Sequence, residues 1–325
     1  GSFYIGKVNN AFQKITGSNK KTSSMVVAVK ADDNADTLSA AAGYTFGVQY
    51  ATGGDQTKSA VKQIEKELGQ NITLQEYSNL GEEAQALYDG EVDAIIYNSA
   101  YSNIIKEQYS TFTKDTKVIY KHNIVVEIES DTSDESVTKP FAVYLSGIDT
   151  NGDITEQGRS DVNIVAVVNP TSHQVLLITT PRDYYVPIPG VSGGQDDKLT
   201  HAGIYGVDVS MQTLEELYDT DIEFFGRVNF TSMTSVVDAL GGLDVESDLE
   251  FDTGWESGAE IHVNEGMNHF DGISALAFCR ERQALPDGDN GRGVHQQAVI
   301  TAIIKKMMSP AMLRGASDII ESVSD

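Results

Sequence analysis

Three of the seven arginines of this chain lie close together, at Arg280, Arg282 and Arg292. Arg280 and Arg282 are two positions apart, so in an extended segment their side chains point to the same side. The stretch that follows is rich in Pro, Asp, Asn and Gly, which predicts a turn-rich loop before a helix that starts near residue 291. In that helix, Arg292 and Gln296 would share one face. Guanidiniums, an amide and a helix N-terminus at one place suit an anion with several oxygens, such as a pyrophosphate.

In a chain of net charge −25 the same arginines could instead be ordinary surface partners of carboxylates. Composition favours the anion site. Residues 1–139 carry 13 Lys and no Arg, whereas residues 140–325 carry 3 Lys and 7 Arg. A segment that has few basic residues, and yet groups its arginines, indicates that they are placed for binding.

Two aspartates follow a similar logic. Asp149 stands at the end of one predicted strand, and Asp161 stands with Arg159 at the start of the next. Two carboxylates beside phosphate oxygens are typical of a Mg²⁺ site. Taken alone, the pair is better explained by a turn cap and a residue that precedes a strand. Arg182, which leaves a neighbouring predicted strand, brings a further arginine to the same place and favours the functional interpretation.

The length and the totals narrow the class of protein. A chain of 325 residues with 40% hydrophobic residues predicts two globular domains. The net charge of −25 argues against sequence-independent nucleic-acid binding. A single cysteine, Cys279, excludes an internal disulfide. No apolar run reaches the length of a membrane span, and the opening Gly1-Ser2 reads as a cloning remnant, so we expect a native N-terminal segment to be missing.

The first part of the chain alternates short apolar runs with amphipathic stretches. This order predicts a small α/β accessory domain over residues 1–135 with a largely parallel sheet, similar to half of a periplasmic-type solute-binding protein. A helix over residues 1–17 could pack across the domain boundary, which we place in the polar connector 130–136. The expected strands are 25–29, 45–50, 72–77, 92–97 and 121–129, and the expected helices are 58–68, 81–89 and 101–109.

The second part, residues 136–325, predicts an α-β-α domain in which helices flank a mixed central sheet. Strands 161–168 and 174–178 are joined by Asn169-Pro170 and are expected to form a hairpin. The other expected strands are 140–148 and 222–230, and the expected helices are 207–218, 231–240, 272–278 and 291–308.

Several motifs in this second part resemble those of the LytR–CpsA–Psr family, over roughly residues 140–310. They are Leu145-Ser-Gly-Ile-Asp149-Thr, Gly158-Arg-Ser-Asp161, Ile178-Thr-Thr-Pro-Arg182-Asp, Lys198-Leu-Thr-His, Arg280-Glu-Arg282 and Asp287-Gly-Asp289-Asn-Gly-Arg292-Gly-Val-His-Gln296-Gln. Residues 1–135 resemble the accessory domain of streptococcal capsule-type members. The resemblance implies a protein anchored by an N-terminal transmembrane segment, with these domains at the extracellular face of the cytoplasmic membrane. It also implies transfer of an anionic or capsular glycopolymer from a polyprenyl-pyrophosphate carrier to the C6 hydroxyl of N-acetylmuramic acid in peptidoglycan.

The resemblance also implies roles for single residues. Asp149 and Asp161 would hold Mg²⁺, with Mn²⁺ as a possible substitute, and these two residues with Arg280 and Arg292 would be catalytic. The expected pyrophosphate ligands are Arg159, Arg182, Arg280, Arg282, Arg292 and Gln296. Thr150 departs from many teichoic-acid-type relatives, which carry Arg after the first Asp, and this weakens any transfer of their substrate preference.

Phosphoryl transfer depends on positioning and charge neutralisation more than on covalent chemistry by the protein. The sequence leaves the general base open between Asp149, Asp183 and Asp289. Cys279 is expected to be a packed small residue, because no activating base lies near it in the sequence.

The predicted last helix carries an apolar stripe, Val299, Ile300 and Ile303, beyond Arg292 and Gln296. The stripe could wall a tunnel for the hydrocarbon tail of a carrier lipid, although ordinary core is the default interpretation of such a stripe. Three functions remain open: glycopolymer transferase, pyrophosphatase acting on the same lipid with water as acceptor, and non-catalytic binder of the carrier lipid or regulator of capsule synthesis.

Overall fold

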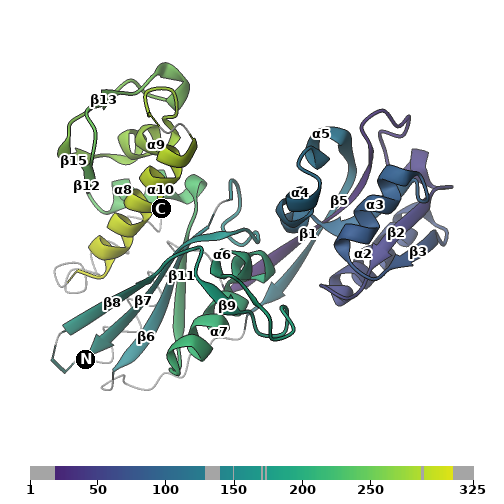
Figure 1. Cartoon of the computed structure of the whole chain (residues 1–325), viewed down its shortest axis with the longest axis horizontal. Helices are drawn as coiled ribbons and strands as arrows, with labels where there is room; N and C mark the ends of the chain where they lie inside the picture. Colours follow the sequence, from purple (N-terminus) through teal and green to yellow (C-terminus); the bar gives the residue numbers. More distant parts are fainter. Residues whose placement is uncertain are drawn as a thin grey trace. The chain divides into compact units, whose positions relative to one another are not determined.

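The computed structural model describes residues 19–128, 140–148, 150–169, 171–172, 174–286 and 289–309, without the side chains of Asp289, Asn290 and Arg292. The chain divides into two compact units (Figure 1). The accessory unit is Lys21–Val126, and the larger unit runs from Glu127 onward and includes Asn19 and Lys20. The connector expected over 130–136 and the helix expected over 1–17 lie outside the described residues.

The accessory unit is built on a five-stranded sheet of order β3-β2-β4-β1-β5. β2 is parallel to β3 and β4, whereas β1 is antiparallel to β4. The expectation of parallel pairing therefore does not extend to β1, because its continuous apolar run indicates burial on both faces but carries no strand direction. The strands are β1 (Lys20–Lys30), β2 (Thr45–Gln49), β3 (Thr73–Tyr77), β4 (Ala94–Asn98) and β5 (Thr116–Glu127).

The three predicted helices of the accessory unit are present, although α2 starts four residues earlier than predicted and α5 was not predicted. Helix α2 ends at Gly69, whose φ of 65° is left-handed, and buries Ala60, Val61 and Ile64 against the sheet. Helix α3 starts at Asn79, whose side chain accepts a hydrogen bond from the backbone N–H of Glu82. The helices are η1 (Ser39–Ala41), α2 (Gly54–Leu68), α3 (Leu80–Asp89), η2 (Ser99–Tyr101), α4 (Ser102–Gln108) and α5 (Phe112–Asp115).

The larger unit has a mixed four-stranded sheet of order β11-β6-β7-β8. β6 is antiparallel to β7 and parallel to β11, and β7 and β8 form the predicted antiparallel hairpin. The strands are β6 (Phe141–Ile148), β7 (Ser160–Asn169), β8 (Gln174–Thr180) and β11 (Phe224–Val228).

Helices cover both faces of this sheet (Figure 1). Along β6, Ala142 and Tyr144 face one layer of helices, while Val143 and Leu145 face the other, because successive side chains of a strand alternate. The first layer contains α6 (Leu199–Ala202), η3 (Gly203–Tyr205) and α7 (Val207–Tyr218). The second contains α8 (Phe230–Ala239), α9 (Gly272–Arg280) and α10 (Asp289–Met307). The predicted α-β-α architecture is confirmed.

Short strands and a short helix complete the larger unit. They have two to five residues each, too few for their apolar periodicity to stand out in the sequence. The antiparallel pairs are β9 (Tyr185–Pro187) with β10 (Asp196–Lys198), β12 (Leu243–Ser247) with β15 (Gly266–Phe270), and β13 (Phe251–Asp252) with β14 (His262–Val263), and the helix is η4 (Trp255–Ser257).

Candidate active site

Three of the predicted site residues, Arg159, Asp161 and Arg182, lie at one edge of the four-stranded sheet. β6, β8 and β11 end at this edge and β7 begins there, because β7 is antiparallel to its neighbours and β11 is parallel to β6. Ile148, the last residue of β6, pairs with Ser160, the first residue of β7. We call the edge defined by Ile148, Ser160, Thr180 and Val228 the site edge.

A β-bulge lies at the site edge. Gly147 pairs with Val162 and the next residue, Ile148, pairs with Ser160, so Asp161 has no partner on β6. A bulge of this kind redirects a side chain out of the regular alternation of the strand. The Asn163 side chain fastens it by donating a 2.9 Å hydrogen bond to the Ser160 carbonyl.

Asp161 and Arg182 are brought together at the site edge. Their ion pair joins Asp161 Oδ1 and Arg182 Nη1 at 2.7 Å, with 15% and 28% of the respective side chains exposed. The Thr200 hydroxyl donates to the same carboxylate oxygen at 3.2 Å, and its backbone N–H donates to the Arg182 carbonyl at 2.9 Å. Thr200 had no role in the sequence interpretation, and only the fold reveals its contact.

A second basic group is carried by α9 and α10. Arg280 is the last residue of α9, and Arg280 and Arg282 are both exposed, on either side of Glu281, which is only 2% exposed. The Gln296 amide lies over the end of α9, where it donates a 3.5 Å hydrogen bond to the Cys279 carbonyl.

Helix α10 is seated so that its N-terminal part reaches the site edge. A Cβ atom on Gly147 would lie 2.6 Å from Cγ2 of Ile300, so the helix lies directly on the end of β6. Gln296 is one helical turn before Ile300, and Arg292 is one turn before Gln296. Helix α10 therefore contacts both the end of β6, through Ile300, and the end of α9, through Gln296.

Glu281 fixes the second group in place. One carboxylate oxygen accepts hydrogen bonds from the backbone N–H groups of Arg282, Gln283 and Ala284, at 2.8–3.0 Å. The other accepts from Gly254 N–H at 2.8 Å and from the Ser257 hydroxyl at 2.9 Å. Burial disfavours the ionised form, but these donors outweigh it and lower the pKa of Glu281 to about 2. No role was predicted for Glu281 from the sequence, in which its position between two arginines was the one available signal.

Some predicted residues cannot be placed in full. Asp149 and the side chains of Arg292 and Asp289 lie outside the described residues. Asp183, another candidate base, lies 3.3 Å from the ammonium of Lys198. Arg159 is half-buried just before the bulge.

Cys279 is fully buried, and burial raises the pKa of its thiol far above the usual range. Its sulfur lies 3.8 Å from the sulfur of Met233. A thiol held in this neutral form is a poor nucleophile, so the environment agrees with the predicted packing role.

The residues predicted to wall a lipid tunnel are core residues in this conformation. Val299, Ile300 and Ile303 are 0%, 3% and 0% exposed within the cluster between α10 and the sheet.

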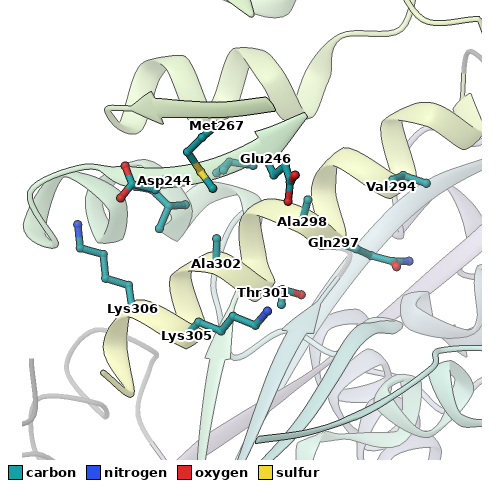
Figure 2. A pocket seen from close by; sticks show the side chains of 12 residues that line it. Asp244, Glu246, Met267, Val294, Gln297, Ala298, Thr301, Ala302, Lys305 and Lys306 are labelled. Atoms are coloured by element: carbon teal, nitrogen blue, oxygen red, sulfur yellow. The ribbon is translucent and has the colours of Figure 1, made fainter. Parts of the chain in front are cut away.

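A groove of about 760 Å³ follows a different face of α10, between that helix and strands β12 and β15 (Figure 2). It is lined by Leu243, Asp244, Val245, Glu246, Met267, Val294, Gln297, Ala298, Thr301, Ala302, Lys305 and Lys306.

Within the described part of the chain, no group of three or more His, Cys, Asp or Glu side chains is arranged to hold a metal ion. Asp161 nevertheless supplies a carboxylate at the site edge, beside the strand end that leads to Asp149. Few protein carboxylates suffice for Mg²⁺, which keeps several waters and takes phosphate oxygens as ligands, so this donor set fits Mg²⁺.

Comparison with known proteins identifies the larger unit. The LytR_cpsA_psr family model matches residues 94–325, a range that starts at the first residue of β4 in the accessory unit. A Bacillus cereus polyisoprenyl-teichoic acid–peptidoglycan teichoic acid transferase, TagU, is 34% identical over 72% of this chain and 71% of its own length. The Enterococcus faecalis TagU is 38% identical over 58% of this chain and 60% of its own length.

Among solved structures, Bacillus subtilis TagV matches with a TM-score of 0.46 and 30% identity, over 58% of this chain and 72% of that one. The family protein YwtF (TagT), with bound octaprenyl pyrophosphate lipid, matches with a TM-score of 0.39 and 30% identity, over 57% and 74% of the two chains. The family model covers well over half of the sequence, and the chain belongs to the LytR–CpsA–Psr family.

Proposed function

We propose that this protein transfers a glycopolymer from a polyprenyl-pyrophosphate carrier to peptidoglycan. The observation that carries the proposal is a grouping of arginines in a unit that has few other basic residues: Arg182 is paired with Asp161 at the site edge, and Arg280 and Arg282 lie at the C-terminal end of α9. Such a group suits the two phosphates of the carrier. The names of the relatives, which are teichoic acid transferases acting on peptidoglycan, support the same reaction.

In the proposed reaction, a sugar hydroxyl of peptidoglycan attacks the phosphorus that bears the glycopolymer. A new P–O bond forms to the acceptor, the P–O bond to the polyprenyl phosphate breaks, and polyprenyl phosphate leaves with the electron pair. The hydroxyl proton passes to a carboxylate, for which Asp149, Asp183 and Asp289 are the candidates. The arginines would neutralise the charge that grows on the leaving phosphate.

Asp149 and Asp161 would hold Mg²⁺ or Mn²⁺, which supplies charge neutralisation at the phosphoryl oxygens when bound. The Asp161 carboxylate is oriented by the Arg182 guanidinium and the Thr200 hydroxyl. This arrangement presents it as an oxygen donor at the site edge.

We place the reaction at the extracellular face of the cytoplasmic membrane, with an N-terminal segment outside this sequence as the anchor, because the family resemblance implies this location. Among the helices in the described ranges, none has both the length and the apolar character that crossing a bilayer requires.

The test is a transfer assay with a glycan-bearing lipid pyrophosphate, Mg²⁺ and peptidoglycan fragments, followed by mass spectrometry of the products. We expect a phosphodiester-linked glycan on the fragment, and a loss of about 10²-fold or more in rate for Arg280→Ala and for Arg292→Ala. Release of free phosphorylated glycan in place of the linked product would establish the pyrophosphatase instead. Tight lipid binding with no turnover would establish the non-catalytic binder.

A further inference from the structure

The single tryptophan of the chain, Trp255, lies on the surface with 75% of its area exposed. It is the first residue of the short helix η4, which lies within a five-residue loop, Gly254–Gly258. Scattered exposed apolar residues are normal in soluble proteins, so exposure by itself carries little meaning. What distinguishes Trp255 is the way in which its loop is held.

Residues on both sides of Trp255 are tied to the same buried carboxylate. The Gly254 N–H and the Ser257 hydroxyl both donate to Oε2 of Glu281, at 2.8 and 2.9 Å. Within the loop, Ser257 N–H donates to the Gly254 carbonyl and Gly258 N–H donates to the Trp255 carbonyl, each at 3.0 Å. The loop closes on a left-handed residue, Gly258, with φ 101°. The indole is therefore presented outward from a fixed backbone.

The same anchor places the loop against the arginine pair. Glu281 is flanked in the sequence by Arg280 and Arg282, and its other oxygen holds the backbone that follows them. A Cβ atom on Gly258 would lie 3.6 Å from Nη1 of Arg280, so the loop reaches the guanidinium itself. The loop that carries Trp255 thus lies next to one of the groups that we assign to the pyrophosphate.

We propose that Trp255 is a platform on which a pyranose ring stacks beside the pyrophosphate site. The inference rests on the proposed function, because it names where the sugar next to the phosphates is received. The face of an indole carries partial negative charge and is apolar, so it attracts the partly positive C–H bonds of a sugar ring. A rigid loop reduces the conformational entropy that is lost on binding. The ring belongs either to the glycopolymer or to the peptidoglycan acceptor, and both present this chemistry.

Because Trp255 is the only tryptophan, its fluorescence reports directly on the proposed platform. The protein is titrated with three ligands: a sugar-free short-chain lipid pyrophosphate, a glycan-bearing lipid pyrophosphate and a soluble peptidoglycan fragment. We expect a change in the emission that saturates with whichever ligand supplies the ring. A response to the glycan-bearing lipid assigns the platform to the donor, and a response to the fragment assigns it to the acceptor.

Variants then test the energy of stacking by calorimetric titration. Trp255→Ala is expected to lower the affinity for the sugar-bearing ligand about three- to tenfold and to leave the affinity for the sugar-free lipid pyrophosphate unchanged. Trp255→Phe should have an intermediate affinity. Ile273→Ala removes another exposed apolar side chain, 58% exposed at the opposite end of α9, and should change neither. Equal affinity of wild type and Trp255→Ala for every sugar-bearing ligand would overturn the platform. Failure of wild type to bind any lipid pyrophosphate would instead contradict the proposed function.

Discussion

Two buried glutamates, one in each unit, show how differently the same side chain can be used. Glu281 in the larger unit and Glu83 on α3 of the accessory unit are 2% and 1% exposed. Glu281 accepts five hydrogen bonds, and its pKa is lowered to about 2. Neither oxygen of Glu83 has a hydrogen-bond partner of ordinary geometry among the described residues. Burial raises the pKa of Glu83 well above its usual value, and the backbone N–H of Ile96 opposes this only in part.

The difference teaches that burial alone does not decide whether a carboxyl group is ionised. Donors that converge on the carboxylate can outweigh the loss of water, and a carboxyl group without them is driven toward the neutral form. The partnered glutamate organises the backbone of the proposed site. Glu83, in contrast, lowers the stability of the accessory unit, because its buried carboxyl group lacks such donors.

A third carboxylate extends the comparison, because Asp161 is partly exposed and forms an ion pair with Arg182. If it holds a metal ion, chelation by EDTA and the variant Asp161→Asn should each lower transfer by about 10³-fold or more. Transfer is measured with and without added Mg²⁺. Full wild-type activity in excess EDTA would exclude the metal role.

Removing each buried glutamate should separate function from stability. Glu281→Ala releases the loop and the backbone that carry Arg280 and Arg282, so we expect transfer to fall about 10²-fold, since small displacements of catalytic groups are costly. Glu83→Ala should leave transfer near the wild-type rate, because Glu83 lies in the other unit. The control is circular dichroism of both variants at the assay temperature. A folded Glu281→Ala variant with wild-type turnover would contradict the positioning role.

The matched amide variants should differ in stability at pH 7. Glu281→Gln replaces an oxygen that accepts hydrogen bonds with an NH₂ group that cannot, and should destabilise the larger unit by about 2–4 kcal/mol. Glu83→Gln removes an acid whose ionised form is penalised by burial, so it should leave the stability of the accessory unit unchanged or raise it. Native-state hydrogen exchange, read separately on peptides of α3 and of the Gly254–Gly258 loop, measures both. Equal losses in the two variants would break the comparison.

The pH dependence should have opposite signs in the two units. The folded pKa of Glu83 is raised, so the folded accessory unit binds the extra proton, and its stability rises as pH falls from 7 toward the unfolded value of about 4.3. The folded pKa of Glu281 is lowered to about 2, so its contribution is constant above about pH 4.3 and is lost as pH falls toward 2. Exchange rates of wild type are compared with those of Glu83→Gln and Glu281→Gln at each pH. A Glu83→Gln profile parallel to wild type between pH 7 and 5 would refute the raised pKa.

The smallest expected effect is on the affinity for the lipid tail, tested at two neighbouring residues of α10 that lie in different environments. Ile303 is buried in the core, and Ala302 lines the open groove (Figure 2). If Ile303 lines a lipid tunnel as predicted, Ile303→Trp should lower the affinity for long-chain lipid pyrophosphates several-fold and leave the affinity for short-chain ones unchanged. If the groove receives the tail, Ala302→Trp should do so instead. If Ile303 is only a core residue, Ile303→Trp should overpack the core, lower the free energy of unfolding by about 1–3 kcal/mol and so lower the melting temperature. Its affinity for long-chain and short-chain lipids would then change equally.

Much of the fold could be predicted because its signals are local. The continuous apolar run of β6, the hairpin turn after Asn169 and the apolar spacing of α7 each follow from a few neighbouring residues. The short strands β12 to β15 escaped prediction because so few residues carry little periodicity. The direction of β1 escaped for another reason, since strand direction is set by pairing with residues far away in the chain.

For the site, the sequence by itself determined which residue types are present and that its arginines are grouped, because composition and spacing are properties of the chain. It could not determine that Asp161 meets Arg182 and Thr200, or that Glu281 turns inward to fasten a loop that bears Trp255. Those contacts join residues 21 to 39 positions apart. They depend on a β-bulge, on the seating of α10 over Gly147 and on the burial of one carboxylate, all of which arise only when the elements pack. Tertiary structure decided them, because the ionisation and direction of a charged side chain depend on the donors that surround it.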